Sequence, residues 1–412
     1  MEILYISSVP SPDEFEHIKG RYKSGFVYGM NESGFKFHTL ILNGMRTRED
    51  VNITSVVGRN VGTRSHKGLL WPCRKERAGE NLSYDHVGFV NLPVAKHLMV
   101  GLNFYFRTRK WLRQTQGKER AIIMDAAYVT AHPFVLAARG KSGCHTSAIF
   151  CDLYEYMADV QDASSTGDVS FLRRTVRKMA TNSYSKLDSF ILLTEQMNPV
   201  VNKLGKPYIV MEGLVDVNMQ EMPNHLENKE PHKTIMYAGA LRAQYGLKNL
   251  VEGFMAYPDP DVRLWIFGAG DYAGDIEEAA RIDNRITFGG MIPLKEAVEK
   301  ELQASLLVNA RPADMEFARY SFPSKNMEYM VSGTPVLTTR LLGMPKDYYD
   351  YVYTIDGNTA EDVTAALEQV LKATPAQLHE KGIAAREFVL KCKNNVAQSG
   401  RILRLVGYSG KD

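Results

Sequence analysis

The stretch FPSKNMEYMVSGT, from Phe322 to Thr334, decides how the region around it folds. Pro323 presets φ for a helix start, Ser324 can cap the helix, and Gly333 suits its end. The apolar run at 336–339 then reads as a buried parallel strand. The stretch therefore predicts a short helix within an α/β domain, with its N-terminus at an edge of the sheet where ligands bind.

Two charged side chains at this helix start indicate which ligand groups it can bind. Exposed N–H groups and the partial positive charge of a helix N-terminus attract phosphate oxygens, and Lys325 adds a full charge. Glu328, one turn further on, can accept both hydroxyls of a ribose. An ordinary helix start with a surface acid is the alternative, but the helix is apolar around Glu328, so a carboxylate there needs a partner. We therefore expect a site for a diphosphate and a sugar diol.

The composition is that of a soluble globular protein with more than one domain. The chain has 412 residues, of which 44% are hydrophobic and 24% charged, and its net charge is only +3. Such a length predicts two or three domains, and so small a charge gives no support for nucleic acid as a partner. The four cysteines form no CxxC pair and no His/Cys metal spacing, which favours a reducing compartment without structural zinc.

The sequence shows neither a signal peptide nor a membrane span, and we therefore expect a cytoplasmic protein. The N-terminus reads as a first strand rather than a signal peptide. No uninterrupted apolar run reaches the roughly 18 residues that a membrane span requires.

Short apolar runs alternate with helical patterns along the chain, which predicts an α/β protein with two Rossmann-like parallel-sheet domains. We predict a first domain at 1–219, a polar linker at 220–233, a second domain at 234–391, and a C-terminal helix at 392–412 that returns to the first domain. The predicted strands are 3–7, 37–42, 53–57, 87–92, 121–124, 147–151, 190–193, 234–238, 263–267, 285–288, 306–309, 336–338 and 351–355. The last helical pattern, at 384–405, breaks near 392–395, so its two parts can pack on different surfaces.

The second half opens with a loop that can meet the same anion as the helix at Ser324. Gly239 ends the first strand, and Arg242 and Lys248 follow it on the way into a helix. Solvated basic residues are the alternative reading of such a loop. Gly268, in a GxG sequence after the next strand, indicates a tight turn near the site and not a complete dinucleotide fingerprint.

A DxD sequence at 259–261 is a second candidate in this half. A proline between the two acids, just before a strand, points to a surface turn and away from a metal site. We expect neither a metal nor another cofactor.

In the first half, His132 and Asp152 each follow a predicted strand. Both should lie at the carboxyl edge of that sheet, where a histidine or an aspartate can take a proton from an attacking hydroxyl or orient a sugar. A hydrogen-bonded core histidine and a helix-capping aspartate are the alternatives.

The segment from Lys96 to Arg120 combines cations with aromatic residues. It could lie on an anionic membrane surface. The alternative is that the aromatic residues pack on the sheet while the basic face is solvated. This segment is in either case the strongest candidate in the sequence for a membrane contact.

Taken together, the motifs of the second half resemble the donor-binding domain of the GT-B glycosyltransferases, in particular the mostly retaining family 4 group of bacterial polysaccharide enzymes. The resemblance covers about 100 residues, and the first half resembles the acceptor-binding domain in outline only. The motifs that carry it are Tyr237 to Gly239 with Arg242 and Lys248, Phe267 to Gly270, Ile286 to Gly290, and Phe322 to Val336.

The resemblance implies a role for each matching residue. Diphosphate binding falls to Arg242, Lys248 and the helix start, ribose binding to Glu328, and the backbone around Met291 and Ile292 edges the base. His132 matches a histidine of the acceptor domain. The full set implied for the donor is Gly239, Arg242, Lys248, Gly268, Met291, Ile292, Tyr320, Ser324, Lys325 and Glu328.

One position departs from the family. An acid stands eight positions before Glu328 in the family's motif, and this chain has Tyr320 there. The contact with the transferred sugar, and with it the stereochemistry, is the feature that this substitution affects. Glu316 and Asp314 lie close by in sequence as substitutes.

The implied activity is metal-independent transfer of a hexose from a nucleotide-diphosphate sugar, most simply a UDP-sugar, to a hydroxyl of a glycan or glycolipid acceptor. Retention of configuration is favoured, and the setting is cell-surface polysaccharide synthesis in the cytoplasm, with peripheral contact to the inner face of the plasma membrane. The alternatives are a UDP-sugar epimerase of the same fold, a nicotinamide-dependent dehydrogenase, and a non-catalytic partner of an active transferase.

Overall fold

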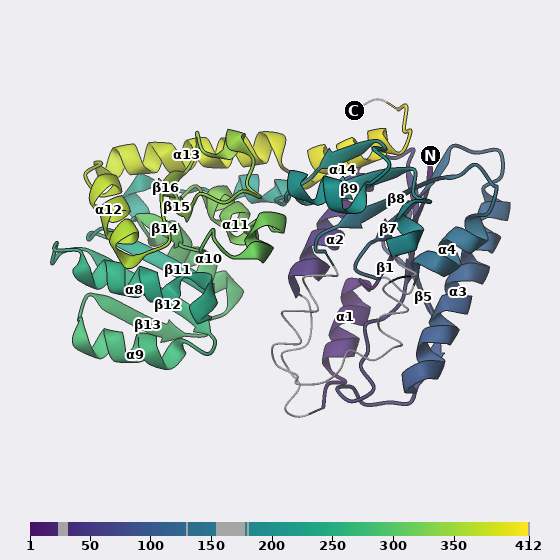
Figure 1. The fold of residues 1–412 in the computed structure, drawn as a ribbon, viewed down its shortest axis with the longest axis horizontal. Helices are drawn as coiled ribbons and strands as arrows, with labels where there is room; N and C mark the ends of the chain where they lie inside the picture. Colours follow the sequence, from purple (N-terminus) through teal and green to yellow (C-terminus); the bar gives the residue numbers. More distant parts are fainter. Residues whose placement is uncertain (24–31, 129–130, 154–177, 179–180, 411–412) are drawn as a thin grey trace. The chain divides into compact units, whose positions relative to one another are not determined.

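The fold is taken from a computed structural model, which describes residues 1–23, 32–128, 131–153, 178 and 181–410. The chain forms two compact units (Figure 1). The first unit comprises Met1–Met211 and Asn395–Asp412, and the second unit comprises Glu212–Asn394. The division therefore falls ahead of the predicted linker, and residues 220–233 lie inside the second unit.

The first unit is built on an eight-stranded sheet with the order β10-β9-β8-β7-β1-β2-β5-β4. All neighbouring strands are parallel except the edge strand β4, which runs antiparallel to β5. A short antiparallel pair, β3 with β6, lies outside this sheet. The strands are β1 (Glu2–Ser7), β2 (Asn52–Val57), β3 (Leu70–Trp71), β4 (Arg74–Arg77), β5 (Leu82–His86), β6 (Phe89–Val90), β7 (Arg120–Asp125), β8 (His145–Phe150), β9 (Ser189–Leu192) and β10 (Tyr208–Val210).

Helices cover this sheet, with α3 packed on α4 and α14 packed on α2 (Figure 1). The contact between α2 and α14 is close, because a Cβ on Gly44 would lie 2.0 Å from the carbonyl oxygen of Asn395. The helices are α1 (Pro12–Lys19), α2 (Glu32–Met45), α3 (Pro93–Gln114), α4 (His132–Arg139), α7 (Asn198–Val201) and α14 (Asn395–Leu405), with the 3-10 turn η1 (Glu195–Met197).

One of the predicted strands in this unit is wrong, and another is confirmed only in part. Residues 37–42 belong to α2, and the buried positions 38, 41, 42 and 45 recur at the spacing of one helix face. A short apolar run does not distinguish a strand from a buried helix segment. Of the predicted strand at 87–92, only the short β6 is present, and the strand that joins the large sheet, β5, ends earlier, at His86.

The second unit has a six-stranded sheet with the order β13-β12-β11-β14-β15-β16, and all of its neighbouring pairs are parallel. The six strands predicted for this half are all present. They are β11 (Thr234–Ala240), β12 (Arg263–Ala269), β13 (Ile286–Gly290), β14 (Leu306–Asn309), β15 (Val336–Thr339) and β16 (Tyr353–Ile355).

Helices lie on both faces of this sheet (Figure 1). α8 and α12 pack on each other over one core, and α11 packs between α10 and α13. The helices are α8 (Leu247–Ala256), α9 (Ala273–Ile282), α10 (Leu294–Gln303), α11 (Ser324–Ser332), α12 (Ala360–Val370) and α13 (Pro375–Cys392). The 3-10 turns are η2 (Val217–Glu221), η3 (Leu226–Asn228), η4 (Ala243–Tyr245), η5 (Glu316–Tyr320) and η6 (Lys346–Tyr348).

The predicted break in the last helical pattern is present. α13 ends at Cys392 and α14 begins at Asn395, so the break falls on Lys393 and Asn394. α13 belongs to the second unit and α14 to the first.

Candidate functional site

The candidate site of the second unit lies where its strand order reverses. From β11 the chain moves outward to β12 and β13, and it then returns to the other side of β11 with β14. The carboxyl ends of β11 and β14 are therefore neighbours whose following loops leave in opposite directions. Ligands of open parallel sheets bind at such a switch point.

Glycines allow the loops after β11 and β12 to touch there. Gly268 has φ +139° and pairs in register with Gly239, and a Cβ on Gly268 would lie 1.8 Å from the carbonyl oxygen of Gly239. A Cβ on Gly270 would lie 2.0 Å from the carbonyl oxygen of Leu241. Only glycine fits both places, and the result is a bare backbone surface that a ligand can approach closely.

The loop after β14 meets the start of α8 in the same way. Gly246 has φ +80° and precedes α8, and a Cβ on it would lie 1.9 Å from the carbonyl oxygen of Ala310. Three loops, those after β11, β12 and β14, thus converge on one edge of the sheet.

Tyr329 fixes α11 to this edge. Its hydroxyl accepts a hydrogen bond from the N–H of Ala238 at 3.0 Å and donates one to the carbonyl of the same residue at 3.2 Å. The ladder between β11 and β14 pairs only Ile235 and Met236, so the tyrosine hydroxyl takes the place of the next strand at Ala238. Burial raises the pKa of Tyr329 well above its usual value, so the hydroxyl stays protonated and able to donate.

A ring of buried polar side chains fixes the first turn of α11. Asn326 accepts a hydrogen bond from Nδ2 of Asn309 at 2.8 Å and donates one to Oγ1 of Thr338 at 3.1 Å. The hydroxyl of Thr338 donates back to the carbonyl of Asn309 at 3.2 Å. The position of the helix start is therefore set by the ends of β14 and β15.

The helix start itself differs from the sequence prediction in one respect. Pro323 is the N-cap and Ser324 is the first helical residue, so Ser324 does not cap the helix, and no side chain among the described residues does. Ser324 is exposed. The N–H of Asn326 donates to the carbonyl of Pro323 at 2.8 Å, so the N–H groups of Ser324 and Lys325 are the ones available to a ligand.

Lys325 and Glu328 lie together at this helix start. A Cβ on Gly239 would be 3.2 Å from Cε of Lys325, so the lysine side chain crosses the end of β11. Its Nζ lies 3.0 Å from Oε2 of Glu328, and both side chains are half-buried. Glu328 therefore has the partner that its apolar surroundings call for.

Further cations stand on the neighbouring loops. Arg242 is exposed in the turn before η4, and Lys248 is exposed in the first turn of α8, where its Nζ is 3.9 Å from Glu252. Arg311, which the sequence prediction missed, follows β14, and its guanidinium carbon lies 5.6 Å from the ring centroid of Tyr245. No motif spacing singles out Arg311, because β14 and η4 meet only in the folded sheet.

The remaining donor-side predictions lie on other loops of the same unit. Met291 is exposed and Ile292 is partly buried after the edge strand β13, at the same end of the sheet. Tyr320 ends η5 and is partly buried, and Asp314 is exposed. The contacts described above join Gly239, Gly268, Lys325 and Glu328 to one another directly, and they do not include these residues.

In the first unit, His132 and Asp152 follow the adjacent strands β7 and β8 at the carboxyl edge. His132 begins α4 and is fully buried, and its Nε2 lies 3.1 Å from the carbonyl oxygen of Asp125. Burial lowers its pKa, and the contact with Asp125 acts in the opposite direction. Its Nδ1 has no hydrogen-bond partner among the described residues, while Asp152 is exposed.

A buried polar triad that the sequence prediction missed stands at the same edge. The hydroxyl of Tyr5 lies 2.6 Å from Nδ1 of His38, and Nε2 of His38 lies 3.7 Å from Asp125. Burial lowers the pKa of His38, and the Asp125 carboxylate acts in the opposite direction. The missed signal is the helical spacing of α2, which places His38 on its buried face.

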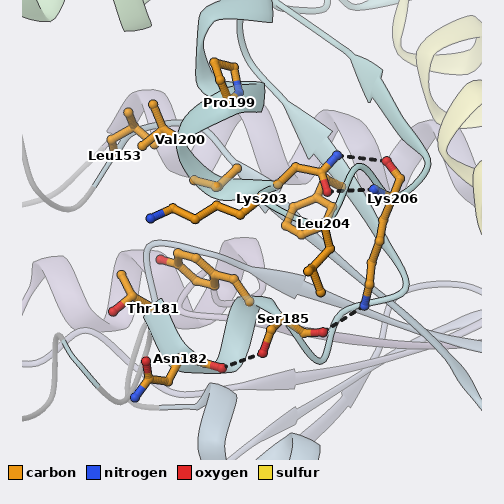
Figure 2. A pocket seen from close by; sticks show the side chains of 13 residues that line it. Leu153, Thr181, Asn182, Ser185, Pro199, Val200, Lys203, Leu204 and Lys206 are labelled. Carbon is orange, nitrogen blue, oxygen red and sulfur yellow. Dashed lines mark hydrogen bonds between the residues drawn. The ribbon is translucent and has the colours of Figure 1, made fainter.

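A cavity of about 740 Å³ opens elsewhere in the first unit (Figure 2). Lys206 spans one side of it and donates a hydrogen bond to the carbonyl of Ser185 at 2.8 Å. Leu153 and Thr181 line it and flank residues 154–177, which lie outside the described residues, so we assign no site to this cavity.

The described residues contain neither a metal-binding cluster nor a membrane-spanning helix. Among the described residues, no three His, Cys, Asp or Glu side chains gather closely enough to hold a metal ion. The acids at 259–261 instead form a turn, in which the N–H of Asp261 donates to Oδ1 of Asp259 at 2.9 Å. None of the described helices has both the length and the apolar character needed to cross a membrane.

The second unit is similar to a known protein family. Residues 218–387 match the family described as glycosyl transferases group 1. The match contains all six strands of the second sheet and the whole of α11. No curated protein matches the chain.

The whole chain is similar in fold to several solved structures. Sucrose-phosphate synthase from Thermosynechococcus elongatus is 13% identical, with a TM-score of 0.64 and 98% of both chains covered. The lipopolysaccharide outer core galactosyltransferase WaaB is 14% identical, with a TM-score of 0.62 and coverage of 98% of this chain and 99% of that one. Anabaena HepE in complex with UDP is 12% identical, with a TM-score of 0.60 and coverage of 98% and 99%. The predicted fold, two α/β units of the GT-B type, and the predicted resemblance are both confirmed.

Proposed function

We propose that this protein is a glycosyltransferase that moves a sugar from a nucleotide-diphosphate sugar to a hydroxyl group. Two findings support this proposal. The second unit matches the glycosyl transferases group 1, and the whole chain has the GT-B fold. One observation carries the assignment to this chain's own residues: the uncapped N-terminus of α11 is fixed at the switch point between β11 and β14, with Lys325 across Gly239.

In the proposed binding mode, the diphosphate lies on the first-turn N–H groups of α11. Ser324 and Lys325 contact it from the helix, and Arg242 and Lys248 contact it from the loop after β11. The bare backbone around Gly239 and Gly268 lets the ligand come close. When the ligand binds, the carboxylate of Glu328 accepts hydrogen bonds from the ribose hydroxyls in place of its contact with Lys325. A half-buried carboxylate needs such donors both with and without the ligand.

In the proposed mechanism, this positive charge acts where negative charge grows. As the bond from the sugar to the diphosphate breaks, charge develops on the leaving oxygens, and fixed N–H dipoles and cations stabilise it. No cofactor is needed for that step. Met291 and Ile292 would edge the base, and Tyr320 would face the transferred sugar.

For the acceptor side, we propose that His132 and Asp152 meet the attacking hydroxyl. Burial keeps His132 neutral near pH 7 by lowering its pKa, which suits a proton acceptor, and its Nδ1 remains unpaired among the described residues. Loss of activity as the pH falls through the lowered pKa of His132 is the expected signature.

The finer parts of the proposal rest on the resemblance. UDP is the proposed nucleotide, and HepE, which has the same fold, was solved with UDP. A glycan or glycolipid of the cell surface is the proposed acceptor, with retention of configuration and a cytoplasmic setting.

The test measures donor binding and turnover in the full chain. UDP should raise the melting temperature, since a ligand that binds only the folded state stabilises it. Lys248→Ala or Arg242→Ala should lower turnover by roughly 10²-fold, the scale for losing one contact to developing charge. Lys295→Ala, an exposed lysine in the same unit, should leave turnover unchanged.

Three results would contradict the proposal. Full turnover in both the Arg242 and the Lys248 variants would remove the diphosphate assignment. Conversion of a UDP-sugar without any acceptor would identify an epimerase. Absence of UDP binding together with a stable protein partner would favour the non-catalytic reading that Tyr320 keeps open.

A further inference from the structure

An apolar stripe runs along the outer side of α3 in the first unit. Leu98, Leu102 and Phe106 are spaced four residues apart, and their exposed fractions are 56%, 42% and 64%. At 100° per residue this spacing places all three on one side of the helix. A helix of a soluble protein normally turns such residues inward.

Further exposed leucines lie on the short β3–β6 ribbon, which adjoins the start of α3. Leu92 immediately precedes α3, and the neighbouring residue Asn91 donates its N–H to the carbonyl of Leu69 at 2.7 Å. Leu69, Leu70 and Leu92 are all exposed. These three residues and the stripe, here called the α3 face, account for half of the exposed large hydrophobic side chains in the described chain. So large a concentration on α3 and the adjoining ribbon marks an interaction surface.

The inner side of α3 already satisfies the packing needs of the helix. Phe104, Trp111 and Leu112 are buried, and they form the packed side of the helix. Phe106 does not take part in that packing. The exposed stripe is therefore additional to the hydrophobic core.

The charge of α3 is entirely of one sign. The 22 residues from Pro93 to Gln114 contain no aspartate or glutamate. Arg107 lies 3.0 Å from Asp85, and Lys96 donates to the carbonyl of Val61 at 2.6 Å, so these two are tied to the protein.

The other cations of the helix face outward. Arg109, Lys110 and Arg113 are exposed, and none has an ion pair within the described residues. Arg109 and Arg113 fall on the same side of the helix as Leu102. Along this side of α3, apolar side chains thus come first and exposed cations follow toward the C-terminal end.

We propose that the α3 face docks on the surface of an anionic lipid bilayer. Leucine and phenylalanine side chains enter the boundary between headgroups and acyl chains, while the three free cations meet lipid phosphates. The helix lies on the surface and does not span it, in keeping with the membrane-span result for the described helices. A second copy of this chain is the poorer occupant, because α3 offers no acid to pair with the cations.

The test is co-sedimentation of the full chain with vesicles. We expect binding to mixed phosphatidylcholine and phosphatidylglycerol vesicles, little binding to phosphatidylcholine alone, and weaker binding as salt screens the cations. Leu102→Ser with Phe106→Ser should reduce the partition coefficient about tenfold or more. Arg109→Gln with Lys110→Gln and Arg113→Gln should reduce it about a hundredfold.

Matched controls separate this face from general hydrophobicity and charge. Ile282→Ser with Leu342→Ser removes two equally exposed apolar side chains of the second unit, and Lys141→Gln with Lys295→Gln and Lys372→Gln removes three exposed cations elsewhere. Both control variants should bind vesicles like the wild type. The UDP-dependent melting shift should be the same in all variants, so failure here is distinguishable from failure of the proposed function.

Each contrary outcome overturns the proposal. Equal binding to neutral and anionic vesicles would remove the role of the cations, and equal losses in the control variants would remove the role of this face. Conversion of a dimer to a monomer by Leu102→Ser with Phe106→Ser, without any vesicle binding, would assign the face to a second copy.

Discussion

Lys229 is a mostly buried lysine at the end of η3. Its Nζ donates a hydrogen bond to Oγ1 of Thr334 at 2.7 Å, and burial lowers its pKa to about 7. Nearby His379 has a lowered pKa, first through burial and then through the charge of Lys229. Glu227 acts on His379 in the opposite direction.

We predict that Lys229→Met stabilises the protein at neutral pH and below. A lysine whose pKa falls on folding binds fewer protons in the folded state, so its charge opposes folding at low pH. This penalty is full below about pH 7 and disappears as the pH rises above about 10.5, the usual value for lysine. The hydroxyl of Thr334 keeps its bonds to Glu301 and Asn224 in the variant.

The measurement is the difference in melting temperature between variant and wild type across that pH range. The gain should shrink steadily from pH 7 to pH 10.5. Lys372→Met, at an exposed position, should show no such trend. A gain that is constant with pH, or a loss at pH 7, would contradict the assigned pKa.

At the scale of elements, α11 is the helix that the proposed binding site depends on. Its position depends on two residues within 322–334 whose roles the sequence alone does not indicate. Asn326 ties the first turn to β14 and β15, and Tyr329 ties the helix to β11. The helix N-terminus is therefore held from both sides of the switch point.

We predict that Tyr329→Phe weakens both stability and donor binding. The change leaves the N–H and the carbonyl of Ala238 without the partner they have now, and an unsatisfied buried group costs about 1–3 kcal/mol. Chemical denaturation should show that loss, and UDP affinity should fall because α11 is no longer held against β11.

Tyr351→Phe is the matched control for this experiment. The hydroxyl of Tyr351 has no hydrogen bond within the described residues, while its ring stacks on Phe388. Removing it should change neither stability nor UDP affinity. If Tyr329→Phe behaved like Tyr351→Phe, the anchoring role of Tyr329 would be wrong.

At the scale of the whole molecule, each unit has its own core, and the chain passes between the units at Met211 and again at Asn394. The second passage makes α14 part of the first unit, where it packs on α2. A Cβ on Gly44 would lie 2.0 Å from the carbonyl oxygen of Asn395 and 2.5 Å from Oγ of Ser399.

We predict that Gly44→Val damages the first unit and spares the second. The new side chain must push α14 away from α2, and such overpacking costs about 1–3 kcal/mol or more. Hydrogen–deuterium exchange should become faster in α2 and α14 and stay unchanged in the strands of the second unit. UDP should still protect those strands.

Gly20→Ala is the control in the same unit. Gly20 has φ −64°, and a Cβ there would meet its nearest atom at 3.6 Å, an ordinary contact. This variant should exchange like the wild type. Faster exchange throughout the second unit in Gly44→Val would show that the units do not respond separately.

Sequence patterns were sufficient for features that local chemistry decides. The six strands of the second sheet and the helix that begins at Ser324 follow from short apolar runs, a proline and a glycine, because such signals act on the backbone within a few residues. The order of glycines and cations along those loops was enough to indicate the GT-B resemblance, while the diphosphate site stays a prediction.

Other features depend on neighbours that are far apart in sequence. The mistaken strand at 37–42 shows the limit, since the same apolar residues serve a buried helix once α14 covers it. Arg311, the Asn326 ring and the bond from Tyr329 to Ala238 appear only when β11 and β14 lie side by side.

The sequence by itself determined the parallel α/β elements and the chemical character of the loops after β11, β12 and β14, since backbone propensity and side-chain type are local properties. Only the tertiary structure decided that α11 is held uncapped against β11, that Lys325 lies across Gly239, and that Phe106 faces outward. The physical reason is that burial and hydrogen-bond partners are set by packing between distant segments, and no local pattern encodes which segments will meet.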